Sequence, residues 1–190
     1  MKPITKDTVV AVILGGPSAE AEISRVTGGA ITNALCEKGY KAQALELNPM
    51  TVINDLHAMG AEVVFNTVHG MYGEDGRLQS LLEAAAIPYT GSRVLASAVA
   101  MDKCATKRFL QAAGSSTAAS MILLRRESKD YVDIKNRILA TFGLPVVIKA
   151  ASQGSSIGVT IAKSEEEIFE NTYLYNLYLA SKESAQLSTK

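Results

Sequence analysis

The order of apolar and polar positions predicts alternating strands and helices in the first half of the chain. A continuous apolar run, Val9–Leu14, is typical of a strand that is buried on both faces of a parallel sheet. Further strands are predicted at residues 40–47, 62–66 and 88–91. The intervening helices are predicted at residues 19–38, 50–59 and 77–86. This alternation predicts βαβ units, an α/β fold and a parallel sheet.

The pattern changes near residue 97, and a second unit is predicted from there. Helices are predicted at residues 101–113 and 131–141, and a strand at 117–124. Two short apolar runs flank a loop of small residues, which predicts a hairpin over 146–162. A helix is predicted to start after Ser164, where three glutamates favour the positive end of a helix. We therefore expect domains at residues 1–96 and 97–170, and a frayed tail at 171–190.

Charge and cysteine content narrow the class of protein. Nineteen basic and nineteen acidic side chains balance among 190 residues, so no global field favours nucleic acid or an anionic membrane. The apolar runs are too short to cross a bilayer. Cys36 and Cys104 lie far apart in apolar segments that are predicted to be helical, and we interpret them as packed thiols. A soluble cytoplasmic protein is the simplest expectation.

Two glycine-rich segments follow predicted strands, where open parallel sheets bind ligands. Gly15-Gly16 opens a helix, so its backbone could approach a ligand and the helix start could offer N–H donors. Glu20 follows in the first turn, either as a partner of the helix dipole or as a ligand for an ammonium group. His69 begins a loop with three glycines and two carboxylates, and it is either structural or placed beside a small ligand.

A third segment combines a lysine with a loop of small polar residues. Lys149 ends an apolar strand, and Gly154, Ser155 and Ser156 follow in a loop that could donate to phosphate oxygens. The alternative is a flexible hairpin tip without a ligand. Lys103 is a second candidate phosphate ligand, although alone it would be an ordinary lysine of a helix surface. The spacing of histidines and cysteines predicts no metal site.

Five segments together resemble the D-alanine–D-alanine ligases of the ATP-grasp superfamily, over residues 8 to 168. They are Gly15–Ser24, His69–Gly76, Pro88–Ser92, Met101–Lys103 and Lys149–Gly158. The resemblance implies a Rossmann-like pre-ATP-grasp domain followed by part of an ATP-grasp central domain. It implies an ATP-dependent ligase that joins two D-alanines through an acyl phosphate, for peptidoglycan synthesis.

The resemblance also implies roles for individual residues. Glu20 would anchor the ammonium of the first D-alanine, Ile23 would contact its methyl group, and His69 would lie beside its carboxylate. Lys103 and Lys149 would bind ATP phosphates, under a loop that contains Gly154, Ser155 and Ser156. Ser155 would also link Glu20 to a tyrosine near the second substrate, so Glu20 and Ser155 are the expected catalytic residues.

The family pattern continues past the phosphate loop into a lobe that carries the Mg²⁺ ligands, and this lobe has no counterpart in the 190 residues. Tyr173, Tyr175 and Tyr178 do not match the family tyrosine. We therefore expect the chain alone to be inactive, with an exposed apolar face that causes association. A non-catalytic fragment or binding module is the alternative, as is a D-alanine–D-lactate or D-alanine–D-serine ligase relative. The family also suggests a homodimer through the N-terminal domain.

Overall fold

The computed structural model describes residues 3–123 and 130–171. The chain divides into two compact units, Met1–Thr106 and Lys107–Lys190. Among the described residues, no helix is long and apolar enough to cross a membrane. The predicted tail at 171–190 lies outside the described residues except for residue 171, which is helical, and the tyrosines at 173, 175 and 178 also lie outside them.

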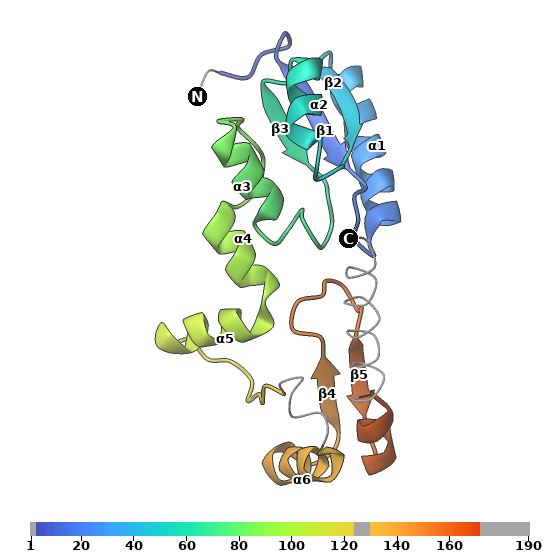
Figure 1. Cartoon of the computed structure of the whole chain (residues 1–190), viewed down its shortest axis with the longest axis vertical. Helices are drawn as coiled ribbons and strands as arrows, with labels where there is room; N and C mark the ends of the chain where they lie inside the picture. The colour runs from blue at the N-terminus through green and yellow to red at the C-terminus, as the bar shows by residue number, and fades with distance from the viewer. Residues whose placement is uncertain (1–2, 124–129, 172–190) are drawn as a thin grey trace. The chain divides into compact units, whose positions relative to one another are not determined.

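The first unit is built on a parallel sheet of three strands with the order β2-β1-β3 (Figure 1). The strands are β1 (Val9–Leu14), β2 (Lys41–Glu46) and β3 (Val63–Asn66). The central strand β1 is apolar throughout because helices cover both of its faces. The predicted strand at 88–91 is reduced to one parallel bridge between Val64 and Tyr89. The predicted parallel α/β sheet is thus confirmed.

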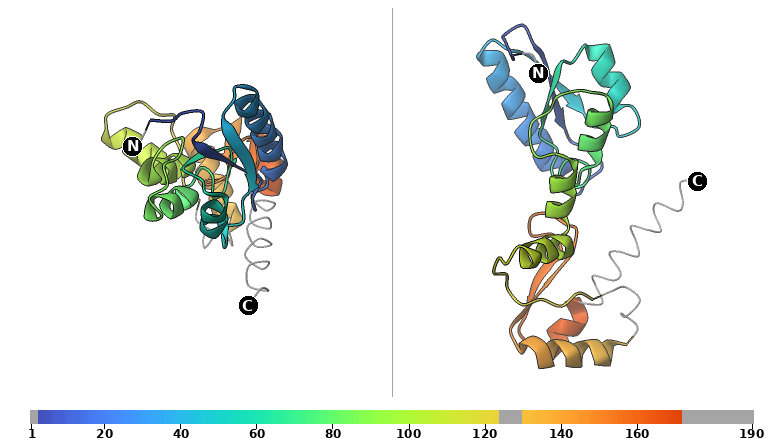
Figure 2. Two further views of the ribbon diagram at one scale, coloured as in Figure 1. Left: turned by 90° about the horizontal axis from the view of Figure 1, so that it is seen from above. Right: turned by 90° about the vertical axis from the view of Figure 1, so that its left-hand side faces the viewer.

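Helices lie on both faces of this sheet (Figures 1 and 2). They are α1 (Ala21–Glu37) on one face, and α2 (Val52–Met59) and α3 (Arg77–Ala84) on the other. Alternate residues of β1 serve the two faces: Val10 and Val12 pack with α1, whereas Ala11 and Ile13 pack with α2 and α3. This is the side-chain alternation that a strand imposes on two helical layers.

The predicted helix at 101–113 is confirmed as α5 (Lys103–Ala112), and a helix that was not predicted, α4 (Val94–Met101), precedes it. Asp102 lies between them with extended backbone angles. Its Oδ1 accepts hydrogen bonds from the N–H groups of Cys104 and Ala105, at 2.8 and 2.9 Å. Asp102 therefore acts as the N-cap of α5.

The second unit contains α6 (Tyr131–Phe142) and the antiparallel pair β4 (Val146–Lys149) and β5 (Val159–Ala162). The predicted hairpin is confirmed. Residues 165–171 are helical, and Ser164 Oγ accepts the N–H of Glu167 at 3.3 Å, as expected for a helix start. The core joins both strands to the two helices through Ile134, Ile138, Ala162 and Ile168.

The predicted strand at 117–124 is wrong over residues 117–123, which form no regular element. Met121 and Leu123 pack against the core of the second unit, so the alternation reflects side-chain packing without a backbone ladder. Leu124 lies outside the described residues. The expectation of packed thiols is wrong for Cys36, which is exposed on α1, whereas Cys104 is half-buried. Both cysteines are free thiols.

Candidate functional site

Both backbone N–H groups of the Gly15-Gly16 turn, at the end of β1, donate hydrogen bonds to other residues of the protein. Gly15 N–H donates to Ser24 Oγ at 2.8 Å, and Gly16 N–H donates to Glu46 Oε1 at 3.2 Å. A Cβ on Gly15 would lie 2.0 Å from the same Glu46 oxygen, and both glycines have positive φ. The turn therefore needs glycine for its own geometry, and its two N–H groups are hydrogen-bonded within the protein.

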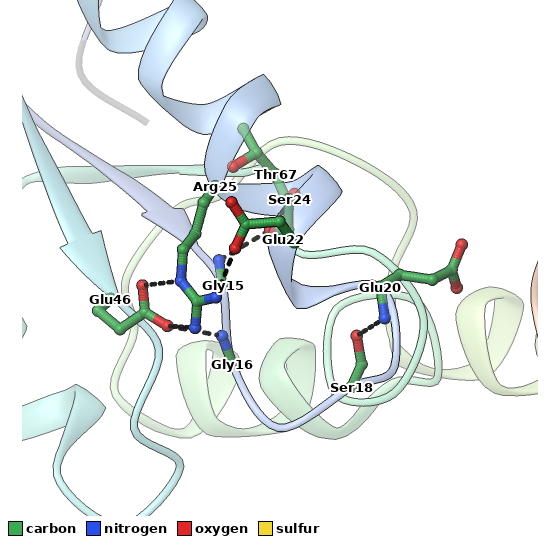
Figure 3. A network of polar contacts seen from close by, with 9 residues as sticks. All are labelled: Gly15, Gly16, Ser18, Glu20, Glu22, Ser24, Arg25, Glu46 and Thr67. Carbon is green, nitrogen blue, oxygen red and sulfur yellow. Dashed lines mark hydrogen bonds and ion pairs between the residues drawn. The ribbon is translucent and has the colours of Figure 1, made fainter.

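Glu20 stands at the N-terminal cap of α1, beside the loop that His69 begins. Its N–H donates to Ser18 Oγ at 3.1 Å, and that hydroxyl donates to His69 O at 2.7 Å. The carboxylate lies over Gly70, where an added Cβ would be 2.8 Å from Glu20 Oε2. It makes no hydrogen bond or ion pair with another residue that the structure describes, and Figure 3 shows it directed away from the neighbouring charged groups.

His69 is half-buried, and its Nε2 lies 3.4 Å from Thr27 Oγ1 of α1. The two carboxylates of its loop brace the loop: Glu74 Oε2 accepts from Gly70 N–H, and Asp75 Oδ2 accepts from Tyr72 N–H, both at 3.0 Å. Both carboxylates are therefore used in hydrogen bonds within the loop. The first unit thus brings the Glu20 carboxylate and the His69 loop together, as the two motifs predict.

A buried chain of hydroxyl groups, which the sequence did not single out, supports this arrangement. Ser24 Oγ accepts from Gly15 N–H and donates to Thr67 O at 2.8 Å, and Thr67 Oγ1 donates to Ile13 O at 2.7 Å. Ser24 is fully buried. The signal was present in the spacing, because Glu20, Ser24 and Thr27 recur at i, i+4 and i+7 on one face of α1.

A pocket of about 410 Å³ lies beside His69 in the first unit. His69 and Thr27 line it, and Gln79 forms part of its wall. Gln79 is buried, and its Nε2 donates to Gly73 O at 2.6 Å. Its Oε1 is a buried acceptor that finds no partner in the described part of the chain. Neither Glu20 nor Ile23 lines this pocket. Ile23 lies in the first turn of α1 and is 59% exposed, which leaves its side chain accessible to a ligand.

The candidate phosphate ligands are divided between the units. Lys103 begins α5 in the first unit and is half-buried, whereas Lys149 ends β4 in the second unit and is exposed. The loop after Lys149 is closed by Ala150 N–H, which donates to Gly158 O at 2.9 Å. Ser155, with a φ of 53°, and Ser156 are exposed in this loop, and Gly154 is half-buried. Their roles toward ATP stay predictions, as does the link from Ser155 to Glu20.

Family models match both units. The description "D-ala D-ala ligase N-terminus" matches residues 41–92, and "D-ala D-ala ligase C-terminus" matches residues 109–176. The chain belongs to the D-alanine–D-alanine ligase family. Among the residues that the structure describes, no group of three His, Cys, Asp or Glu side chains could hold a metal ion.

Relatives and solved structures of the ligase family agree with this assignment. A D-alanine–D-alanine ligase of Moorella thermoacetica is 43% identical over 184 residues, which are 92% of this chain and 59% of that protein. A D-alanine–D-alanine ligase structure from Bacillus anthracis has a TM-score of 0.76 at 30% identity, and covers 90% of this chain and 54% of that one. The structure of that enzyme complexed with ATP has a TM-score of 0.69 at 30% identity, with coverages of 90% and 55%. The chain thus spans somewhat more than half the length of these ligases.

Proposed function

We propose that this chain supplies the site for the first D-alanine and part of the ATP site of an ATP-dependent D-alanine–D-alanine ligase. Such a ligase makes D-alanyl-D-alanine for peptidoglycan through an acyl phosphate, in the cytoplasm where ATP is available. The observation that carries the proposal is the carboxylate of Glu20, which has no partner among the described residues and lies over Gly70 next to His69.

The first substrate is an amino acid zwitterion, and the residues near Glu20 suit its two charges and its methyl group. Glu20 would accept hydrogen bonds from the ammonium, since a charge-assisted contact of this kind is stronger than a neutral one. His69, held near Thr27, would lie beside the carboxylate of the substrate. Ile23, exposed in the same turn of α1 as Glu20, would contact the methyl group.

Lys103 and Lys149 would bind the phosphates of ATP, with Gly154, Ser155 and Ser156 closing over them. The similarity to a Bacillus anthracis ligase whose structure contains ATP supports this part of the proposal. Ser155 would additionally contact Glu20 in the working site. The described residues do not offer a donor set that fits Mg²⁺, so no step through that ion is assigned to them.

We further propose that the 190 residues alone do not turn over substrate, since they correspond to 59% of the length of an intact relative. The test is phosphate release from ATP by the purified chain with Mg²⁺ and D-alanine. A full-length ligase of the family serves as the positive control. Sustained release by this chain would contradict the proposal.

The substrate site is tested separately by calorimetry with D-alanine, because binding does not need turnover. We expect heat from the native chain and its loss in Glu20→Gln, which removes the charge but keeps the shape. Glu22→Gln is the matched control, since Glu22 is exposed on the same helix turn. L-alanine tests the stereochemical preference. Binding of D-alanine without phosphate release is the outcome expected both for part of a ligase and for the second candidate, a binding module, which the unpartnered carboxylate of Glu20 also supports. Phosphate release after the remaining part of a full-length ligase of the family is added to this chain would favour the ligase.

A further inference from the structure

Glu46 and Arg25 form a charged contact beside the glycine turn (Figure 3). Glu46 is the last residue of β2, and Arg25 lies one residue beyond the buried Ser24 on α1. Arg25 Nε donates to Glu46 Oε2 at 3.1 Å, and Arg25 Nη2 donates to Oε1 at 2.8 Å. The two parallel bonds form the bidentate geometry that fixes a carboxylate in one orientation.

The Glu46 carboxylate, which Arg25 holds in one orientation, fixes the position of the Gly15-Gly16 turn. Glu46 Oε1 also accepts the N–H of Gly16, and it occupies the space where a Cβ on Gly15 would project. Gly15 N–H is held on its other side by Ser24. Each glycine amide of the turn therefore has one partner. The partner of Gly16 is Glu46, which belongs to the neighbouring strand β2.

The position of the Gly15-Gly16 turn also limits where Glu20 can lie. Only Pro17, Ser18 and Ala19 separate Gly16 from Glu20, and Ser18 binds both Glu20 N–H and His69 O. A shift of the turn would carry this short segment with it. The charge of Glu46 is compensated by Arg25, whose hydrogen bond lowers the pKa of the Glu46 carboxyl and keeps it ionised. The pair therefore shapes the site without competing with Glu20 for an ammonium group.

We propose that Glu46 and Arg25 are positioning residues, which hold the Gly15-Gly16 turn and thereby place the Glu20 carboxylate for D-alanine. This inference rests on the proposed function only for the identity of the ligand. The hold on the turn is a property of the chain alone, and it can be measured without substrate.

The test compares amide hydrogen exchange and D-alanine binding, both by NMR, in the native chain, Glu46→Gln and Arg25→Gln. Glu22→Gln is the matched control, because Glu22 Oε2 contacts Arg25 Nη1 at 3.1 Å but does not touch the turn. Loss of one exposed charge-assisted contact predicts exchange at Gly16 and Glu20 about fivefold faster, and D-alanine binding about fivefold weaker. The control should stay within about twofold of the native chain, and a shared melting temperature would exclude global unfolding.

Two results would overturn the inference. The first is unchanged exchange at Gly16 and Glu20 in both variants. The second is faster exchange at these amides with D-alanine affinity that stays at the native level. If the native chain bound no D-alanine, the proposed substrate would fail, and exchange at the Glu20 amide alone would decide whether the pair positions that residue.

Discussion

The hydroxyl group of Ser24 shows how one buried atom can join three segments of the chain. It accepts a hydrogen bond from the turn after β1 and donates one to the carbonyl of Thr67 after β3, while its own backbone belongs to α1. Buried backbone groups need such partners, because an unpaired one loses its hydration without compensation. The first turn of α1, which carries Glu20, is therefore fastened to both strand ends.

Ser24→Ala should destabilise the first unit by about 2 kcal/mol, because it leaves two buried backbone groups without their partner. Urea unfolding followed by circular dichroism measures this loss. Thr32→Ala is the control on the same helix, since Thr32 Oγ1 only donates to Gly28 O within α1. The control should change the free energy of unfolding by about 0.5 kcal/mol or less. Equal losses in the two variants would contradict the bridging role of Ser24.

Gly70→Ala should disturb both the backbone and the Glu20 carboxylate. Gly70 has a φ of +69°, so alanine there costs about 1 kcal/mol. Gly60→Ala is a matched control, because Gly60 has a φ of +68° and open space around its Cα. Both variants should lose similar stability in chemical unfolding, whereas only Gly70→Ala should weaken D-alanine binding in calorimetry. Unchanged D-alanine binding in Gly70→Ala would show that the Glu20 carboxylate does not bind the ligand.

Tyr89 should ionise well above the ordinary range for tyrosine. Burial, followed by its hydrogen bond to Glu83 Oε1 at 2.7 Å, raises the pKa of Tyr89 to about 12. Because the folded pKa is raised, this contribution to stability is present below about pH 10 and is lost as the pH rises toward 12. The phenolate absorbance of the native chain minus that of Tyr89→Phe isolates this titration. Glu83→Gln should lower the midpoint, and a native midpoint near pH 10 would refute the expectation.

At the scale of elements, two adjacent glycines in α1 differ in their surroundings. A Cβ on Gly28 would lie 2.5 Å from Leu14 Cβ and 2.7 Å from Thr67 Oγ1, whereas a Cβ on Gly29 would meet nothing within 4 Å. Gly28 therefore permits the close approach of α1 to the sheet. Gly29 faces open space, where the low helix propensity of glycine is not offset by any contact.

Gly28→Ala and Gly29→Ala should consequently change stability in opposite directions. Gly29→Ala should stabilise the first unit by about 0.5–1 kcal/mol through helix propensity. Gly28→Ala should destabilise it by about 1–3 kcal/mol, because the extra methyl overpacks the contact between α1 and β1. Thermal and urea unfolding of the two variants measure both effects. A stabilising Gly28→Ala would show that α1 is not held at this distance from the sheet.

The elements that the sequence predicts well are those whose cause is local. The run Val9–Leu14 ends at a glycine, the hairpin over 146–162 is two short apolar runs around a loop that contains glycine, and both match the structure. The start of α5 is predicted only to within two residues, because it depends on which backbone amides the Asp102 side chain caps. Exposure of Cys36 was missed because an apolar helix segment does not reveal which side faces the sheet.

In the candidate site, too, the residues that local motifs mark could be predicted, and those that act through distant contacts could not. Glu20 and the His69 loop could be found from motifs that follow strands, and the fold brings them together. Glu46 could not be found, because its role depends on the parallel register that places β2 beside β1. Thr67 likewise acts across a sequence separation of more than forty residues. Contacts of this range need the topology as well as the sequence.

At the scale of the whole molecule, the second unit has an apolar surface on its hairpin. Val147 and Ile161 face each other across β4 and β5, and they are 50% and 55% exposed. The other face of the hairpin, with Val146 and Ile148, packs against the core of the unit. Within the described residues this sheet has two strands, so each strand also has an unpaired edge. An apolar strand surface beside open edges favours pairing with another chain.

We therefore predict that the chain associates through this hairpin, as size-exclusion chromatography with light scattering can show against the monomer mass of 20.2 kDa. The double variant Val147→Lys/Ile161→Lys should shift the chain toward monomer, because charges on a strand surface oppose edge-to-edge pairing. Val132→Lys is the matched control, since Val132 is 62% exposed on α6 of the same unit but lies outside the hairpin. It should leave the mass distribution unchanged. A native chain that is a monodisperse monomer would contradict the prediction, and a double variant that still dimerises would assign the contact to another surface.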